Sequence, residues 1–206
     1  MPDQATPEVD SAVSTRRLLA TTQVIFFASL ALCVIVNHST KAQQDGISFY
    51  GVWPPTVIVV VAGYAAGGLG LWRAGSWFRA AAAPSSVFLG VRVVALGLPL
   101  LLATPYDEGA VLNWTHMTIG VAMALVQAAG TIALVRRRSR VDAWVLFAAQ
   151  LAGGLLAAAS LPTWHFAFLL QGEIVYELAY GVSLIVWVYE LAQVGRRSSR
   201  VTRSNA

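Results

Sequence analysis

The sequence predicts an all-α, polytopic membrane protein with six transmembrane helices and both termini in the cytoplasm. Three observations support this fold class. Only 12% of the 206 residues are charged and 57% are hydrophobic, whereas a soluble domain has about 25% charged residues. Six apolar runs are each long enough to cross a hydrocarbon core of ~30 Å, which takes about 20 residues. The basic residues occur in alternate connections between these runs, as the positive-inside rule requires.

Short segments with turn-forming and charged residues separate the predicted spans. In chain order they read "NHSTKAQQDG", "RAGSWFRAAAAPSS", "TPYDEGA", "RRRSRVD" and "LPTWH". The six spans are residues 18–37, 55–72, 86–104, 112–135, 143–161 and 166–190. We therefore expect one six-helix bundle over residues 16–192. The polar segment 1–15 and the basic segment 193–206 are expected to be disordered tails.

The basic residues set the predicted orientation. Twelve of the fourteen Lys and Arg residues flank one side of the spans: Arg16, Arg17, Arg73, Arg79, Arg136, Arg137, Arg138, Arg140, Arg196, Arg197, Arg200 and Arg203. The opposite side has only Lys41, and Arg92 lies within a span. This bias places the basic side in the cytoplasm of a multi-pass cell-membrane protein. The basic residues are interpreted as partners of anionic lipid headgroups, not of nucleic acid.

Small residues cluster on two predicted spans. The second span contains Gly63, Gly67, Gly68 and Gly70, and the fifth contains Gly153 and Gly154. Small residues let helix backbones approach closely within a membrane. Packing within one bundle is the favoured interpretation, and a homo-oligomer joined through these faces is the alternative.

Two carboxylates lie inside the predicted sixth span. In "LLQGEIVYELAYG", residues 169–181, Glu173 and Glu177 are four residues apart and so stack on one face of a helix. An ionisable group near the bilayer centre costs a few kcal/mol or more, which makes each a candidate functional residue. With a rise of ~1.5 Å per residue, Glu173 lies ~10 Å and Glu177 ~16 Å below the outer face.

A layer of polar side chains is predicted at the depth of Glu177. Counted from the cytoplasmic face, the expected heights are ~14 Å for Glu177, ~10 Å for Arg92, ~10 Å for Gln150 and ~8 Å for Gln127. Because either charge alone would be costly in lipid, we expect Arg92 and Glu177 to be neighbours in the bundle interior and to form a buried ion pair that fixes helix register.

Glu173 is the predicted catalytic acid. It has no cation at its own depth, and burial without a counter-charge favours the protonated form of a carboxyl. Such a group can donate a proton in an apolar site. Tyr176 and Tyr180 lie beside the carboxylate stripe and would line that site.

A second polar set is predicted near the outer face. Its members include His38, Asn113, His116 and His165, together with loop carboxylates. Three histidines with carboxylates could bind zinc, but they lie on different spans and loops without ligand spacing. We therefore predict no metal site. No phosphate-binding loop, G-x-S-x-G or H-E-x-x-H motif is present, so no cofactor is predicted.

Three stretches carry a resemblance: "DGISFYGVWPPT", "LNWTHMTIG" and "WHFAFLLQGEIVYELAYG". They resemble an uncharacterised bacterial family of small six-span membrane proteins, distantly similar to DRAM-type proteins. This resemblance covers most of the chain and implies a fold without an established activity.

"GEIVYELAY" is also similar to the Trp-Glu-x-x-Tyr helix of the small integral-membrane terpene cyclases. In that family a membrane-embedded acid protonates an isoprenoid, which would give Glu173 the role of acid with Tyr176 as its neighbour. Gly172 replaces the tryptophan, the motif lies in the last span, and the family's second acid has no counterpart here.

Two functions follow as expectations. The first is an acidic and aromatic intramembrane pocket for a lipid-like or isoprenoid ligand, with acid-catalysed cyclisation or isomerisation by Glu173. The alternative is a non-enzymatic membrane protein, either a proton-coupled carrier or a partner-binding subunit.

Overall fold

The computed structural model describes residues 7–138, 140–160 and 167–204, and within these ranges it contains helices and no strand. Six helices are long and apolar enough to cross a membrane. They are α1 (Pro7–Val36), α4 (Pro54–Ala80), α5 (Ser85–Ala103), α6 (Ala110–Arg138), α7 (Val141–Ala159) and α8 (Leu169–Ser204). The predicted fold class is thus confirmed. Two short helices, α2 (Thr40–Asp45) and α3 (Ser48–Val52), lie in the connection between α1 and α4.

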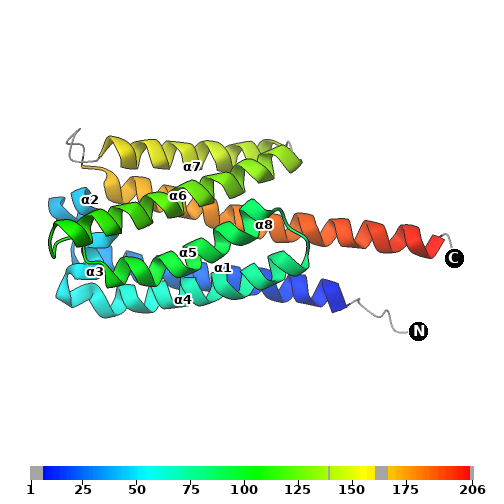
Figure 1. Cartoon of the computed structure of the whole chain (residues 1–206), viewed down its shortest axis with the longest axis horizontal. Helices are drawn as coiled ribbons and strands as arrows, with labels where there is room; N and C mark the ends of the chain where they lie inside the picture. The colour runs from blue at the N-terminus through cyan, green and yellow to red at the C-terminus, as the bar shows by residue number, and fades with distance from the viewer. Residues whose placement is uncertain (1–6, 139, 161–166, 205–206) are drawn as a thin grey trace.

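The six long helices form one bundle (Figure 1). Helix α1 packs against α4 and α8, α4 packs against α5, and α5 packs against α6. Helix α6 contacts α7 and α8, which closes the bundle around a common interior. Helix α7 is the least buried span and α8 the most buried, so α8 is the helix best placed to present side chains to the interior.

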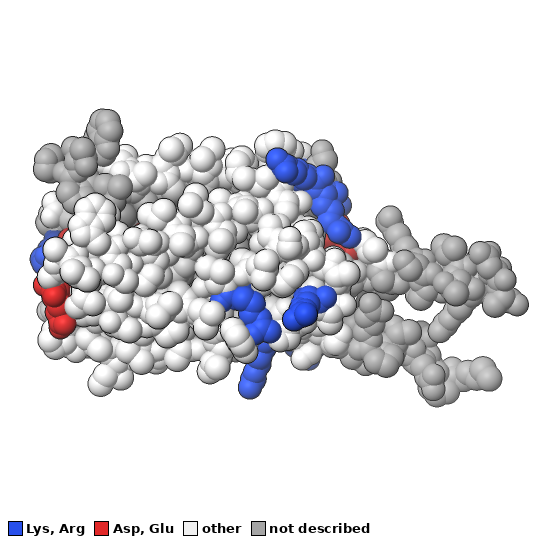
Figure 2. All heavy atoms as spheres, in the orientation of Figure 1, with Lys and Arg blue, Asp and Glu red and all other residues white. Residues whose placement is uncertain are grey.

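The two ends of the bundle differ. Both chain termini lie at one end, called here the terminal end, whereas α2 and α3 lie at the other, called the cap end (Figure 1). Figure 2 shows Lys and Arg mostly toward the terminal end, acidic groups at the cap end with a further acidic patch toward the terminal end, and a broad uncharged belt between the two ends. Large apolar side chains such as Ile35 and Ile58 are exposed on the bundle surface, as contact with lipid requires. The cytoplasmic location of the terminal end stays a prediction.

Helix α1 begins earlier and α8 ends later than expected. Residues 7–15 and 193–204, expected to lie in disordered tails, are helical. Proline is favoured at the first position of a helix, and Pro7 occupies that position. The added turns of α1 also pack against the bundle, because Ala12 and Thr15 are buried. At the other end, no proline follows Leu191 to stop α8.

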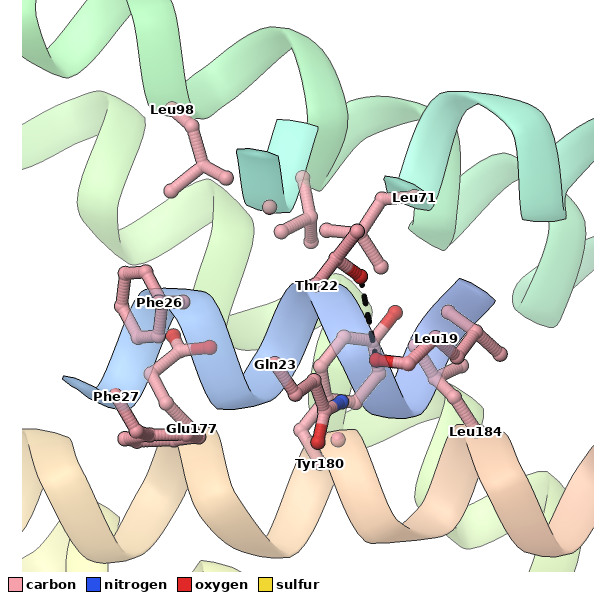
Figure 3. Close-up of a pocket in the computed structure, with 13 residues that line it drawn as sticks. Leu19, Thr22, Gln23, Phe26, Phe27, Leu71, Leu98, Glu177, Tyr180 and Leu184 are labelled. Atoms are coloured by element: carbon pink, nitrogen blue, oxygen red, sulfur yellow. Dashed lines mark hydrogen bonds between the residues drawn. The ribbon is translucent and has the colours of Figure 1, made fainter. Parts of the chain in front are cut away.

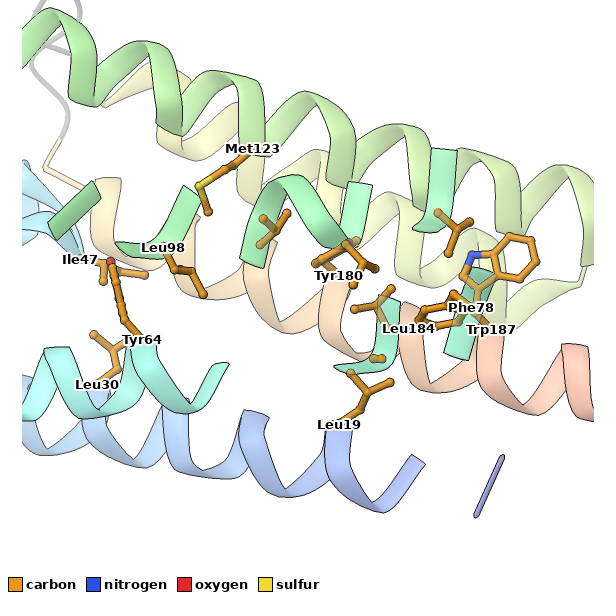
Figure 4. Packing of buried hydrophobic residues seen from close by; sticks show 14 of the residues in the cluster. Leu19, Leu30, Ile47, Tyr64, Phe78, Leu98, Met123, Tyr180, Leu184 and Trp187 are labelled. Atoms are coloured by element: carbon orange, nitrogen blue, oxygen red, sulfur yellow. The ribbon is translucent and has the colours of Figure 1, made fainter. Parts of the chain in front are cut away.

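Glycines on α4 and α7 allow close packing within the same chain. A Cβ at Gly63 would lie 2.9 Å from the Cβ of Ser29 on α1. A Cβ at Gly153 would lie 2.7 Å from the carbonyl oxygen of Gly172 on α8. The small-residue faces are therefore covered within one bundle. Below the cap, the interior is filled by buried apolar side chains, including Leu19, Phe78, Leu98, Met123, Leu184 and Trp187 (Figure 4).

Candidate intramembrane acid site

Helix α8 carries the two carboxylates on one face, as their spacing predicts. Glu173 and Glu177 are both partly buried, and neither forms an ion pair with a described Lys or Arg side chain. Their environments nevertheless differ, because Glu173 faces the cap and Glu177 faces the middle of the bundle.

Glu173 connects α8 to the segment that contains α2 and α3, called here the cap. Its Oε2 accepts a hydrogen bond from the backbone N–H of Ile47, with an N···O distance of 2.6 Å. The preceding residue, Gly46, has φ +71° and ψ −155°, a conformation that is essentially restricted to glycine. The Glu173 carboxylate fills the space that a side chain at position 46 would need. Glycine therefore lets the backbone turn and brings the carboxylate to the N–H of Ile47.

Glu177 is bound by an amide from α6. The Gln127 Nε2 group donates to both carboxylate oxygens, at 3.0 and 3.1 Å. Gln127 is fully buried. Toward the terminal end the polar contacts continue, because the Thr131 hydroxyl donates to the Ser183 hydroxyl oxygen at 3.4 Å and Ser183 donates to the carbonyl of Ala179. Gln127, Thr131 and Ser183 thus form a row of polar side chains, called here the polar column, that runs beside α8 from Glu177 toward the terminal end.

Glu177 also lines a cavity that is bordered by α1, α4, α5 and α8 and is partly open to the surface (Figure 3). Aromatic rings from α1 and α8 border it, together with aliphatic side chains and the polar groups Thr22 and Gln23. Glu177 is the one carboxylate among its lining residues. The cavity volume is about 50 Å³, whereas pockets for drug-sized ligands are ~300–1,000 Å³. It has room for a few water molecules, since a cavity measured in the same way needs at least ~10–15 Å³ to hold one water.

The predicted ion pair between Arg92 and Glu177 is wrong. The Arg92 guanidinium lies over the ring of Trp72, with Cζ 3.7 Å from the ring centroid. Its Nη2 donates to the Ser76 hydroxyl at 2.7 Å, so its partners are on α4. The physical reason is side-chain direction, because helical side chains lean toward the N-terminus of their own helix. Helices α5 and α8 run in opposite directions, so Arg92 leans toward the terminal end and Glu177 toward the cap end.

The other predicted polar residues divide into two groups. Tyr180 lines the cavity with Glu177. Tyr176 faces α6 and α7, and its hydroxyl donates to the carbonyl of Ala124. Gln150 is buried beside Tyr176, but neither atom of its amide has a hydrogen-bond partner of normal geometry. The Oε1 atom of Gln127 also lacks one. Of the residues expected in one polar layer, Gln127 contacts Glu177, Gln150 lies beside Tyr176, and Arg92 has its partners elsewhere.

The outer polar set is only partly brought together. His116 on α6 contacts Ser48 on α3, with 2.7 Å between Nε2 and Oγ, and its Nδ1 is 2.7 Å from the carbonyl oxygen of Thr104. His38 is exposed and its Nε2 accepts from the amide of Gln43. Asn113 lies in the first turn of α6 near the cap end. His165 lies outside the described residues.

Tyr106 links the cap to the connection between α5 and α6. Its hydroxyl donates to Asp45 Oδ2 at 2.7 Å, and the same carboxylate oxygen is 2.7 Å from Lys41 Nζ. Burial, followed by the hydrogen bond to Asp45, raises the pKa of Tyr106 well above its ordinary value. Across the described part of the chain, His, Cys, Asp and Glu side chains form no group of three that could hold a metal ion.

Several site residues were not found from the sequence. Phe26 and Phe27 look like ordinary span residues, and the signal available on the first helix was the polar run of Thr21, Thr22 and Gln23. Ser48 had no signal of its own, because its partner is 68 positions away. Gly46 was visible only as part of a turn-forming segment.

No protein-family model matches the chain, and no curated protein or solved structure matches it either.

Proposed function

We propose that this integral membrane protein contains a proton-exchange site centred on Glu177, of the kind that a proton-coupled carrier requires. The observation that supports this is the position of Glu177, a carboxyl that faces a partly open cavity between helices and forms no ion pair with a described Lys or Arg side chain. A carboxyl within the bilayer is costly. A function that uses its proton would explain its presence in the bundle interior.

The cavity next to Glu177 supports proton exchange. Its volume is suited to a few waters, and Thr22 and Gln23 supply polar groups that could hydrogen-bond to them. Gln127 binds the carboxyl from the other side. Water in this cavity would give Glu177 a partner for proton transfer, and the hydroxyls of Thr131 and Ser183 extend the polar column toward the terminal end.

Infrared difference spectroscopy on protein in lipid vesicles tests this proposal without knowledge of a substrate. A change from about pH 4 to about pH 9 should titrate carboxyl groups, and the C=O stretch of a protonated buried carboxyl should change in the wild type. Glu177→Gln should remove the part of that signal that comes from Glu177 and leave the part that comes from Glu173. The matched control is Glu108→Gln, which alters an exposed carboxyl in the connection between α5 and α6. An unchanged signal in Glu177→Gln would refute the proposal.

The second candidate function is acid-catalysed chemistry on a lipid-like or isoprenoid ligand, as in the membrane terpene cyclases. The aromatic rings of Phe26, Phe27 and Tyr180 around the cavity favour it, because ring faces stabilise a developing cation. In this case α1 would have to move to admit a ligand, given the cavity volume. Glu177 would then be the better-placed proton donor, and Glu173, with Tyr176 one turn away, would remain the alternative acid.

The two candidates predict different products. A cyclase would convert a linear polyene into a product of identical mass with a new chromatographic retention time, because one proton is added and another is lost. Glu177→Gln and Glu173→Gln, compared under the same conditions, would identify the donor. Proton exchange at Glu177 without conversion of polyprenyl substrates would favour the carrier.

A further inference from the structure

We propose that Ser48 and His116 form a nucleophile–base pair at the cap end that cleaves or transfers acyl esters of lipid-like substrates. The Ser48 Oγ and His116 Nε2 atoms are 2.7 Å apart, and the His116 Nδ1 atom is 2.7 Å from the Thr104 carbonyl oxygen. These two contacts reproduce the arrangement of an activated serine: a base within reach of the hydroxyl and a third group that orients the base.

The direction of both hydrogen bonds follows from their chemistry. A backbone carbonyl can only accept, so Nδ1 of His116 must donate its proton to Thr104. In the neutral imidazole the other nitrogen then has a free lone pair. The Ser48 hydroxyl must therefore donate to Nε2. This tautomer is the one in which a histidine can take the proton of a serine nucleophile.

Three separate elements hold this arrangement. Ser48 is the first residue of α3, His116 lies on α6, and Thr104 follows α5. The position of Ser48 is fixed further by its neighbour Ile47, whose N–H is bound by Glu173. The ring of Tyr106 lies against His116, with ring centroids 6.0 Å apart. Packing and hydrogen bonds from the surrounding chain hold the side chains of a reactive pair in a fixed geometry.

The location indicates the class of substrate. Ser48 and His116 are both partly exposed, and they lie at the cap end, where the bundle would meet the membrane surface. On α6, Val111 and Trp114 are 79% and 70% exposed, on the side of the helix turned away from His116, so apolar side chains face lipid at about the depth of the pair. An exposed Trp near a span end is typical of the interfacial zone. An ester joining an acyl chain to a polar headgroup would lie at this depth.

The chemical steps balance with water as the second reactant. The Ser48 Oγ attacks the ester carbonyl and forms a C–O bond while its proton moves to His116 Nε2. The bond to the alcohol then breaks, and His116 returns the proton to the leaving alkoxide. Water releases the acyl group from Ser48 by the same steps, with His116 again taking and returning a proton. The products are a carboxylic acid and an alcohol.

A fluorophosphonate probe tests the pair directly. Attack by Ser48 forms an O–P bond, breaks the P–F bond and passes the proton to His116. Purified full-length protein in detergent should be labelled, and peptide mass spectrometry should locate the adduct on Ser48. His116→Gln should slow labelling by about 100-fold or more, as expected for loss of a general base, and Ser48→Ala should abolish it. Thr115→Ala, which removes an exposed hydroxyl next to His116, should label normally.

The same experiment separates catalysis from a purely structural hydrogen bond between α3 and α6. A structural bond predicts that wild-type Ser48 is not labelled, or that it is labelled equally fast in His116→Gln, and either outcome overturns the proposal. The wild-type adduct is informative even if a variant folds poorly. Melting temperatures of both variants show whether slower labelling reflects lost structure. A folded Ser48→Ala that still hydrolyses a short-chain ester at the wild-type rate would also overturn it.

Discussion

The cap end and the polar side chains around Glu177, called here the intramembrane layer, differ in how completely their polar groups are hydrogen-bonded. At the cap, hydrogen bonds cross between elements and anchor side chains to backbone, as in Glu173 to Ile47 and His116 to Thr104. In the intramembrane layer, buried amides outnumber their partners: Gln150 has none for either amide atom, and Gln127 has one unpaired oxygen. Unsatisfied polar groups are expensive in a membrane. The unpaired amide atoms of Gln127 and Gln150 lie outside the lining of the cavity beside Glu177, and they show that this layer is less completely hydrogen-bonded than the contacts named at the cap.

The strongest way to break the intramembrane layer is to separate α7 from α8. A Cβ in Gly153→Ala would lie 2.7 Å from both the Gly172 oxygen and the Tyr176 nitrogen. These are backbone atoms that cannot rotate away, so we expect a loss of about 3 kcal/mol in the free energy of unfolding, at the upper end for overpacked sites. Thermal unfolding in detergent measures it. Gly120→Ala is the matched control, because nothing lies within 4 Å of its added Cβ. Equal stability of the two variants would show that the α7–α8 contact is dispensable.

The cap is most sensitive at Gly46. Gly46→Ala would force a side chain into a backbone conformation that costs about 1–3 kcal/mol and would push against the Glu173 carboxylate. We expect a loss of about 2 kcal/mol, measured by the same thermal assay. Glu173→Ala separates the two causes in a double-mutant cycle. If the carboxylate contributes, the combined loss should be smaller than the sum of the single losses; strictly additive losses would show that backbone strain alone is responsible.

Two glutamines in the layer should respond differently to replacement by leucine. Gln127→Leu removes the donor to Glu177 and should destabilise the protein by about 1 kcal/mol, the usual net value of one hydrogen bond. Gln150→Leu removes an amide without partners and should be neutral or stabilising, since an apolar replacement no longer carries a desolvated polar group. Their melting temperatures test this. A clear loss in Gln150→Leu would mean that ordered water satisfies Gln150, which would extend the hydrated region beyond Glu177.

The sequence predicted the helices better than the directions of their side chains. Spans, glycine faces and the stacking of Glu173 on Glu177 follow from periodicity and length, which depend on local chain geometry. Arg92 illustrates what is lost: its depth matched Glu177, but opposite helix directions turn the two side chains away from each other. The pair of Ser48 and His116 depends on where a loop folds back onto α6. Distances along one helix cannot predict such a contact.

Tyr106 should give the smallest effect and the sharpest test of the cap. Tyr106→Phe removes the hydrogen bond to Asp45 and should cost about 0.5–1 kcal/mol at neutral pH. Because burial and Asp45 raise the pKa of Tyr106 in the folded protein, the unfolded chain ionises first as pH rises. The tyrosine therefore contributes its full stabilisation below about pH 10, its unfolded value, and loses it as the pH rises through the folded pKa. Melting temperature followed into alkali should fall less steeply in Tyr106→Phe than in the wild type, and Asp45→Asn should fall between them. Identical alkaline slopes in all three proteins would mean that the hydroxyl contact with Asp45 does not hold the cap to the α5–α6 connection in solution.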